Sequence, residues 1–155
     1  LHEAGDGQWL FDYPAQGQAL VPGEGRVYAA DAGDLVVFTY GNGVPMALRA
    51  ARAIEQQLGW QVRVVDLRWL VPLDAAFIAT QAASARRVLV LDEGRHSGGV
   101  GEGVVTALVE AGFGHLPLRR VCGADTYTPL AGAAMFGLPS DNAVIGAALE
   151  LAQEP

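Results

Sequence analysis

The residues best suited to chemistry lie in one short segment in the second half of the chain. Asp92, Glu93, Arg95 and His96 follow Val88–Leu91, an apolar run rich in β-branched residues that is typical of a strand buried on both faces. A histidine beside carboxylates can titrate near neutral pH and transfer protons. His96 is therefore our candidate for a residue at the periphery of an active site, and a solvated loop histidine is its simpler interpretation.

A glycine-rich run follows these polar residues and begins a helix. Gly99-Val-Gly101-Glu-Gly103 resembles a dinucleotide-binding fingerprint, but several polar residues separate it from the strand and its last glycine comes one residue early. A tight strand-to-helix turn explains the glycines more simply, and an anion could still bind at the helix start. The candidate ligand or anion loop consists of Glu93, Arg95, His96, Gly98, Gly99 and Gly101.

Other polar residues fit structural roles. Asp66 and Arg68 form either a structural ion pair that holds a connector or a contact with a partner subunit. Asp74 can N-cap the helix that follows it, and Asp125 completes this set of four residues to which we assign a structural role. Cys122 is interpreted as a small buried hydrophobe.

No residue pattern supplies a complete catalytic site or a metal site. The three histidines are widely separated and lack the spacing of a zinc site, and the single cysteine excludes an internal disulfide. No serine stands in a nucleophile-elbow pattern. We therefore expect no metal and no catalysis by this chain alone.

Strand and helix patterns alternate along most of the chain. The expected strands are Arg26–Ala30, Leu35–Tyr40, Gln61–Asp66, Val88–Leu91 and Leu116–Val121. The expected helices are Pro45–Leu58, Ala75–Ala83, Val100–Ala111 and Asn142–Gln153, with Asp141 as the cap of the last and an irregular segment over Cys122–Pro139. The alternation predicts a three-layer α/β/α sandwich around a mainly parallel, five-stranded sheet. Ligands of such sheets meet the carboxyl ends of the strands, where the polar segment lies.

The composition indicates one globular domain with a lead-in. The chain has 155 residues, 51% of them hydrophobic and 17% charged, and its net charge is −7. Its ten basic residues are scattered arginines, which argues against nucleic-acid binding, and the acidic balance argues against membranes. Residues 1–25, rich in glycine and proline, are interpreted as a linker, and residues 26–155 as the domain. A chain without an initial methionine suggests a piece of a longer or processed protein, and one cysteine fits a reducing cytoplasm.

Four motifs in order carry a resemblance to a known family. They are Val36–Gly41, Asp66–Asp74, Asp92–Gly94 with Gly98–Gly101, and Arg120–Thr126 followed by Pro129 and Leu138-Pro139. The series resembles the carboxyl-terminal domain of the transketolase superfamily. It is most similar to the β subunit of thiamine-diphosphate-dependent 2-oxo acid dehydrogenases of the pyruvate or branched-chain (2-oxoisovalerate) type. The similarity covers about Arg26 to Leu151, and residues 5–10 resemble the segment that links the preceding domain to this one.

The resemblance implies a supporting role. In that family the first strand, here Arg26–Ala30, runs antiparallel to the rest, and thiamine diphosphate and Mg²⁺ lie between two other domains. The domain builds the contact between β subunits, helps to shape the active-site surroundings and, in some members, docks the subunit-binding domain of the dihydrolipoyl acyltransferase core. A second β subunit and the α subunit are the other implied partners. Arg95 and His96 stand where the family often carries Trp, Pro or Arg, and residues 131–137 depart from its acidic and aromatic pattern.

Two alternatives stay open from the sequence. The first is the same domain of a transketolase or a deoxyxylulose phosphate synthase, where Arg95 would meet a sugar phosphate; the motif Arg120–Thr126 disfavours it. The second is a free-standing module that binds a small ligand or nucleotide at the Gly41 or Gly99 loop. The sequence does not indicate which 2-oxo acid a parent enzyme would use.

Overall fold

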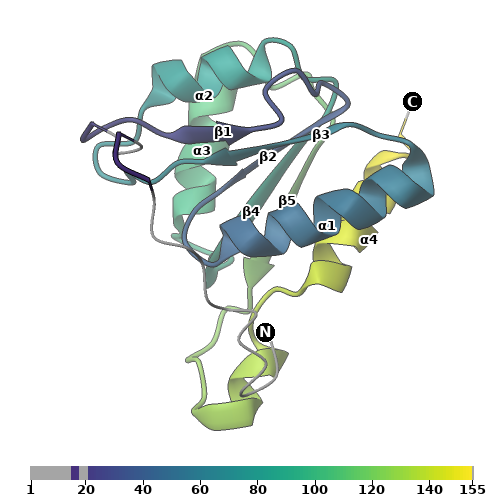
Figure 1. Cartoon of the computed structure of the whole chain (residues 1–155). Helices are drawn as coiled ribbons and strands as arrows, with labels where there is room; N and C mark the ends of the chain where they lie inside the picture. The colour runs from purple at the N-terminus through teal and green to yellow at the C-terminus, as the bar shows by residue number, and fades with distance from the viewer. Residues whose placement is uncertain (1–14, 18–20, 155) are drawn as a thin grey trace.

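The computed structural model describes residues 15–17 and 21–154, so most of the predicted lead-in lies outside the described residues. A five-stranded sheet runs through the molecule in the order β1-β3-β2-β4-β5 (Figure 1). The strands are β1 (Arg26–Tyr28), β2 (Leu35–Thr39), β3 (Val62–Asp66), β4 (Val88–Arg95) and β5 (Leu118–Gly123). Only β1 runs antiparallel to its neighbour, and the other three pairs are parallel. The predicted fold class is confirmed, including its antiparallel edge strand.

Four α-helices cover the two faces of the sheet, as Figure 1 shows. They are α1 (Gly43–Leu58), α2 (Ala75–Ala82), α3 (Val100–Glu110) and α4 (Asp141–Leu151). Helices α1 and α4 pack on one face, and α2 and α3 on the other. A short 3₁₀ helix, η1 (Ala131–Phe136), precedes α4.

The central strands are mostly apolar because both of their faces are buried. In β2, Leu35 and Val37 pack against α1 and α4, whereas Val36 and Phe38 pack against α2 and α3. Successive side chains of a strand point to opposite faces, so a strand covered twice needs apolar residues throughout. The rule sends the polar residues at the end of β4 to opposite faces as well, and this determines the site described below.

Several helices and strands begin or end at residues other than those predicted. Helix α1 begins at Gly43 behind the N-cap residue Asn42, so Pro45 lies inside its first turn, where a missing N–H is tolerated. Strand β4 continues beyond Leu91 to Arg95, and β5 is shifted toward the carboxyl terminus. Residues Ala131–Phe136 form η1 within the segment predicted to be irregular.

The prediction that Asp141 caps α4 is wrong. Ser140 is the N-cap residue, and its hydroxyl accepts a hydrogen bond from the Ala143 amide at 3.2 Å. Asp141 is the first helical residue and binds Arg49 of α1 through two hydrogen bonds of 2.7 and 2.8 Å. A short polar side chain therefore satisfies the helix start, while the carboxylate joins two helices on the same face.

Candidate functional site

The centre of the candidate site is the carboxylate of Asp92, which is buried at the end of β4 with 1% of its surface exposed. The Tyr40 hydroxyl donates to Asp92 Oδ1 at 2.6 Å, and the Gly94 amide donates to the same oxygen at 2.7 Å. The Gly101 amide, in the first turn of α3, donates to Oδ2 at 2.7 Å. A buried charge is tolerated when it is hydrogen-bonded in this way and lies at the positive end of a helix. Asp92 thus joins the ends of β2 and β4 to the start of α3.

The side chain of Glu93 lies on the opposite face of the sheet from that of Asp92. Asp92 follows Val90 on the face of α2 and α3, whereas Glu93 follows Leu91 on the face of α1 and α4. Glu93 accepts a side-chain hydrogen bond from Asn42, the N-cap residue of α1, and burial raises the pKa of its carboxyl group despite that bond. Two adjacent carboxylates are therefore directed to the starts of two different helices.

The glycines of this segment are required by the close approach of the Asp92 carboxylate. A Cβ added at Gly94 would lie 2.8 Å from Asp92 Oδ1, and one at Gly99 would lie 2.7 Å from Oδ2 and 2.8 Å from the Arg95 carbonyl oxygen. Gly98 has a φ of +70°, a backbone conformation that other residues rarely adopt. The tight-turn interpretation of the glycine run therefore has a physical basis in this structure.

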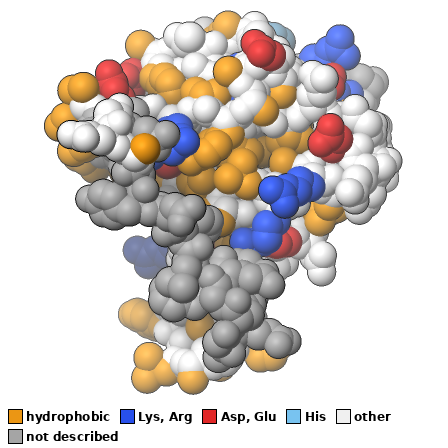
Figure 2. All heavy atoms as spheres, viewed as in Figure 1, with side chains coloured by type: hydrophobic (Ala, Val, Ile, Leu, Met, Phe, Trp, Pro, Cys, Tyr) orange, Lys and Arg blue, Asp and Glu red, His pale blue; other side chains and the backbone are white. Residues whose placement is uncertain are grey.

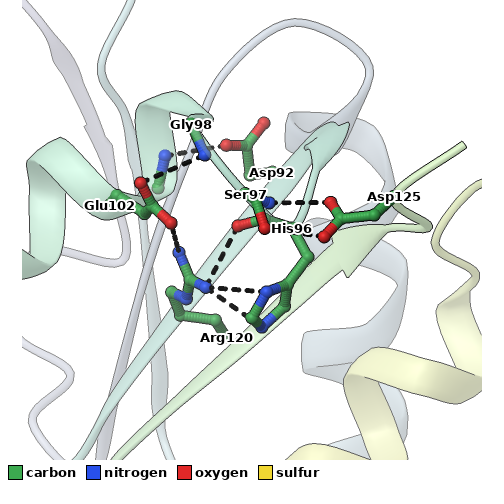
Figure 3. Close-up of polar contacts among 8 residues, drawn as sticks. Asp92, His96, Ser97, Gly98, Glu102, Arg120 and Asp125 are labelled. Atoms are coloured by element: carbon green, nitrogen blue, oxygen red, sulfur yellow. Dashed lines mark hydrogen bonds and ion pairs between the residues drawn. The ribbon is translucent and has the colours of Figure 1, made fainter.

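The tip of the β4–α3 loop is fixed by a second set of polar contacts, drawn in Figure 3. Ser97 donates from its amide and its hydroxyl to the Asp125 carboxylate, at 2.8 and 2.6 Å. The Gly98 amide donates to Glu102 at 3.1 Å. Arg120 of β5 donates to the His96 carbonyl oxygen at 3.2 Å and approaches the His96 ring, with Nη2 3.0 Å from Nε2. Its guanidinium also lies 3.8 Å from Glu102.

The electrostatics of the cluster favour a fixed structure over reactive groups. Burial, then the hydrogen bond to Asp92, raises the pKa of the Tyr40 phenol far above its usual value, so Tyr40 stays a donor. Burial likewise raises the pKa of the partly buried Cys122 thiol, which favours its protonated form at neutral pH. The two hydrogen bonds from Ser97 lower the pKa of Asp125.

The four residues assigned a structural role lie in three separate places, because Asp66 and Arg68 bind each other. Asp66, at the end of β3, accepts from the amide and the side chain of Arg68, both at 3.2 Å. Asp74 caps α2 by accepting from the Phe77 amide at 2.8 Å. Asp125 belongs instead to the loop contacts with Ser97. Each of the three carboxylates thus accepts a hydrogen bond from a backbone amide, of Arg68, Phe77 or Ser97.

The structure brings together part of the predicted loop and adds residues that sequence reasoning missed. His96, Gly98 and Gly101 lie in the contacts above, while Arg95 is exposed at the end of β4. Tyr40, Ser97, Glu102 and Arg120 were not predicted as site residues. For Tyr40 a signal existed, because it directly follows a buried strand and must reach the same sheet edge as Asp92.

Among the described residues, no enclosed ligand cavity lies around Asp92. The side chains between Tyr40, Asp92 and Gly101 leave no space for a water molecule. A recess of about 460 Å³ lies away from this cluster, beside β1 and the beginning of β3, where its walls include Tyr28, Leu48 and Val62. Within residues 15–17 and 21–154, no group of three or more His, Cys, Asp or Glu side chains could hold a metal ion. In the same part of the chain, no helix is long and apolar enough to cross a membrane.

Comparison with known proteins gives a consistent family. The family model described as "Transketolase, C-terminal domain" matches residues 23–142. The chain is 35% identical over 144 residues to the 3-methyl-2-oxobutanoate dehydrogenase subunit beta of Mycobacterium tuberculosis, covering 92% of this chain and 39% of the relative. It is also 35% identical over 136 residues to the pyruvate dehydrogenase E1 component subunit beta of Staphylococcus aureus, covering 86% of this chain and 39% of that protein. The chain therefore spans about two fifths of the length of these relatives.

Solved structures agree on the fold. A structure titled "Split gene transketolase, inactive beta4 tetramer" superposes with a TM-score of 0.75 at 25% identity, over 92% of this chain and 45% of that chain. A 2-oxoglutarate:ferredoxin oxidoreductase from Magnetococcus marinus superposes with a TM-score of 0.56 at 17% identity, over 84% of this chain and 20% of that chain. The second match supports the fold alone.

Proposed function

Because the chain belongs to the transketolase C-terminal domain family, we propose that it is the carboxyl-terminal assembly domain of a 2-oxo acid dehydrogenase β subunit. The observation that carries the proposal is the 35% identity to two such β subunits over most of this chain. Since the chain corresponds to 39% of their length, the decarboxylating activity belongs to the larger assembly and not to this domain alone.

The surroundings of Asp92 do not fit thiamine diphosphate or Mg²⁺. A magnesium ion needs oxygen ligands, whereas the buried carboxylate of Asp92 already accepts three hydrogen bonds from its own chain. The surroundings of Asp92 also have no room for a ligand. Both groups are therefore proposed to bind other parts of the parent enzyme.

The role that we propose for this domain is to present a fixed loop at the carboxyl edge of the sheet. Asp92 holds the base of the β4–α3 loop, and Asp125, Glu102 and Arg120 hold its tip. The loop can then shape the surroundings of an active site built by neighbouring domains, with His96 and Arg95 at its periphery. A fixed loop costs less conformational entropy when a partner binds it.

The expected partners follow from the same proposal. They are a second β subunit, the α subunit and the subunit-binding domain of a dihydrolipoyl acyltransferase, in a cytoplasmic complex. The relative titled as a β4 tetramer supports association between copies of the chain. The net charge of −7 and the scattered arginines support protein partners over nucleic acid or anionic membranes.

Isothermal titration calorimetry on the purified chain tests the proposal. Thiamine diphosphate with Mg²⁺ should give no saturable heat, and the chain alone should not decarboxylate pyruvate or 2-oxoisovalerate. Tight cofactor binding would contradict the proposal.

Two further titrations separate the alternatives. Saturable binding of a sugar phosphate, lost in Arg95→Ala, would favour a transketolase or deoxyxylulose phosphate synthase domain. Saturable binding of a nucleotide would favour a free-standing binding module, and its site would be tested at the Gly99 loop.

A further inference from the structure

The recess between β1 and α1 lies on the face of the sheet that α1 and α4 cover, at the edge formed by β1. Its volume of about 460 Å³ falls within the range of about 300–1,000 Å³ that small-molecule sites occupy. Figure 2 shows hydrophobic side chains gathered over the region between β1 and α1, with charged side chains around them. The recess is therefore large enough for a metabolite, and it is separate from the filled surroundings of Asp92.

Small side chains create this recess. One of its walls is a single stripe of α1 with the helical spacing i, i+3, i+4 and i+7, formed by Leu48, Ala51, Arg52 and Glu55. Ala51 lies in the middle of the stripe and contributes only a methyl group. Ala29 and Ala32, in the turn after β1, also line the recess. A larger side chain at any of these three alanines would occupy part of the space.

The floor of the recess is apolar. Tyr28 of β1, Leu48 of α1 and Val62 of β3 line it, and all three belong to the core on this face or pack against it. The guanidinium of Arg26 stacks on the Tyr28 ring, 4.8 Å from its centroid, and restricts the ring on one side. An apolar group of a ligand can therefore replace water against these side chains, which is favourable.

Charged residues of both signs border the apolar floor. Asp31, Arg52 and Glu55 line the recess and are exposed. Within residues 15–17 and 21–154, none of these three side chains forms an ion pair or a hydrogen bond. Arg52 differs in this respect from most arginines of the chain, which meet a carboxylate, a carbonyl oxygen or an aromatic ring. The three charges are therefore available to a ligand.

The spacing of Arg52 and Glu55 indicates which charges the ligand carries. Residues three apart on a helix are neighbours, with Cβ atoms about 5–6 Å apart, so a guanidinium and a carboxylate lie side by side on the α1 wall. An α-amino acid has the complementary pair, a carboxylate and an ammonium on one carbon atom. The planar guanidinium can donate two hydrogen bonds to the ligand carboxylate. The carboxylate of Glu55 or Asp31 can accept from the ammonium.

We propose that this recess is a binding site for a small zwitterionic molecule with an apolar side chain, the class to which apolar α-amino acids belong. The charged groups of the ligand bind Arg52 and Glu55 or Asp31, and its side chain packs on Tyr28 and Val62. This domain supplies the whole site, so the proposal goes beyond the proposed function and does not depend on it. A small ligand in an open recess should bind in the millimolar range.

Titration of the full, isotope-labelled chain with L-leucine, followed by NMR, is the direct test. We expect saturable amide shifts that cluster at residues 28–32, 48–55 and 61–62. L-leucinamide lacks the carboxylate and isocaproate lacks the ammonium, so each should bind about 10-fold more weakly or worse. No saturable shift from L-leucine at high millimolar concentration overturns the proposal. Isocaproate that binds as tightly as L-leucine overturns the zwitterion as the ligand class.

Two variants locate the site. Ala51→Leu fills the recess from the α1 wall and should abolish the binding of L-leucine. Ala53→Leu is the matched control, because Ala53 lies on the same helix and does not line the recess. Spectra without ligand should show that the variants keep the fold. Unchanged binding by Ala51→Leu places the site elsewhere and overturns the proposal.

Arg52→Gln tests the charge and changes an exposed side chain, so it remains informative even if Ala51→Leu does not fold. We expect it to weaken L-leucine by about 10-fold or more. It should leave the weaker binding of L-leucinamide unchanged, because that molecule has no carboxylate to bind. An equal loss for both molecules would mean that Arg52 acts only through the structure of the recess, and it would overturn the role assigned to the guanidinium.

Discussion

Two neighbouring segments at the carboxyl edge of the sheet meet their physical requirements in opposite ways. The β4–α3 loop is polar, and its carboxylates, amides and histidine ring find partners within the same chain, at distances of 2.6–3.3 Å. The arm, as we name residues 124–137 between β5 and α4, is apolar, and its largest side chains find no cover in the described residues. The polar groups named here are therefore satisfied within the chain, whereas the exposed surface of the arm is hydrophobic. The polar contacts of the loop stabilise the domain itself, whereas the apolar side chains of the arm are available to a partner.

The largest effect on stability is expected when the internal partner of the loop is removed. Asp92→Ala leaves the Tyr40 hydroxyl and the Gly94 and Gly101 amides without their acceptor in a buried place. We expect the free energy of unfolding to fall by about 3–5 kcal/mol in urea denaturation. A loss below about 1 kcal/mol would mean that the carboxylate does not organise this edge, and the contrast between the two segments would disappear.

A smaller loss is expected from crowding the same carboxylate. Gly99→Ala places a Cβ 2.7 Å from Asp92 Oδ2 and 2.8 Å from a backbone oxygen, and overpacking of this kind costs about 1–3 kcal/mol. Gly146→Ala is the control, because nothing lies within 4 Å of a Cβ at that position of α4. Removing a glycine from a helix should stabilise the chain by about 0.5–1 kcal/mol. Equal effects of the two substitutions in thermal denaturation would contradict the role assigned to Gly99.

Glu93 gives a pH-dependent test of the loop. Burial raises the pKa of its carboxyl group in the folded chain, so the ionised form is less favourable when folded, and this contribution to stability falls as the pH rises through the raised pKa. Glu93→Gln keeps an acceptor for Asn42 and removes the charge. We expect it to increase the free energy of unfolding at neutral pH by less than about 1 kcal/mol. Below about pH 4, where the acid is protonated in both states, the advantage should vanish.

The smallest effect on the stability of a single chain is expected in the arm. Phe136 is 93% exposed, so Phe136→Ser removes little buried surface and should change the free energy of unfolding by less than about 0.5 kcal/mol under dilute, monomeric conditions. Chemical denaturation at low concentration measures this term. A large loss there would show that the arm packs within its own chain, and it would remove the second half of the comparison.

The sequence predicts the layers of this fold well because apolar runs report burial directly. The apolar run Leu35–Phe38 in β2 and the alternation of strands and helices are enough to predict the sandwich. The extent of β4 was not predictable in the same way, because one of the donors that satisfy the buried Asp92 in its polar continuation is Tyr40, which lies 52 residues away. Periodicity indicates which residues are covered and carries no information about distant donors.

The arm contains a helix, η1, that could not be predicted from the sequence. The glycines and prolines of Cys122–Pro139 correctly predict an interruption of the regular pattern, but the apolar residues between them gave no indication of η1. Hydrophobic residues are normally expected inside, so no pattern in a single sequence tells an exposed apolar helix from a buried one. That distinction depends on which neighbours the rest of the chain supplies.

The Asp92 carboxylate also has a consequence for competition at the start of α3. A helix start is a place where free anions bind, and here the first turn already holds an anion that is tethered by its own backbone. A tethered group acts at an effective concentration in the millimolar range or higher, and it arrives with its orientation already set. A dissolved phosphate or carboxylate would have to displace the Asp92 carboxylate before it could bind the Gly101 amide.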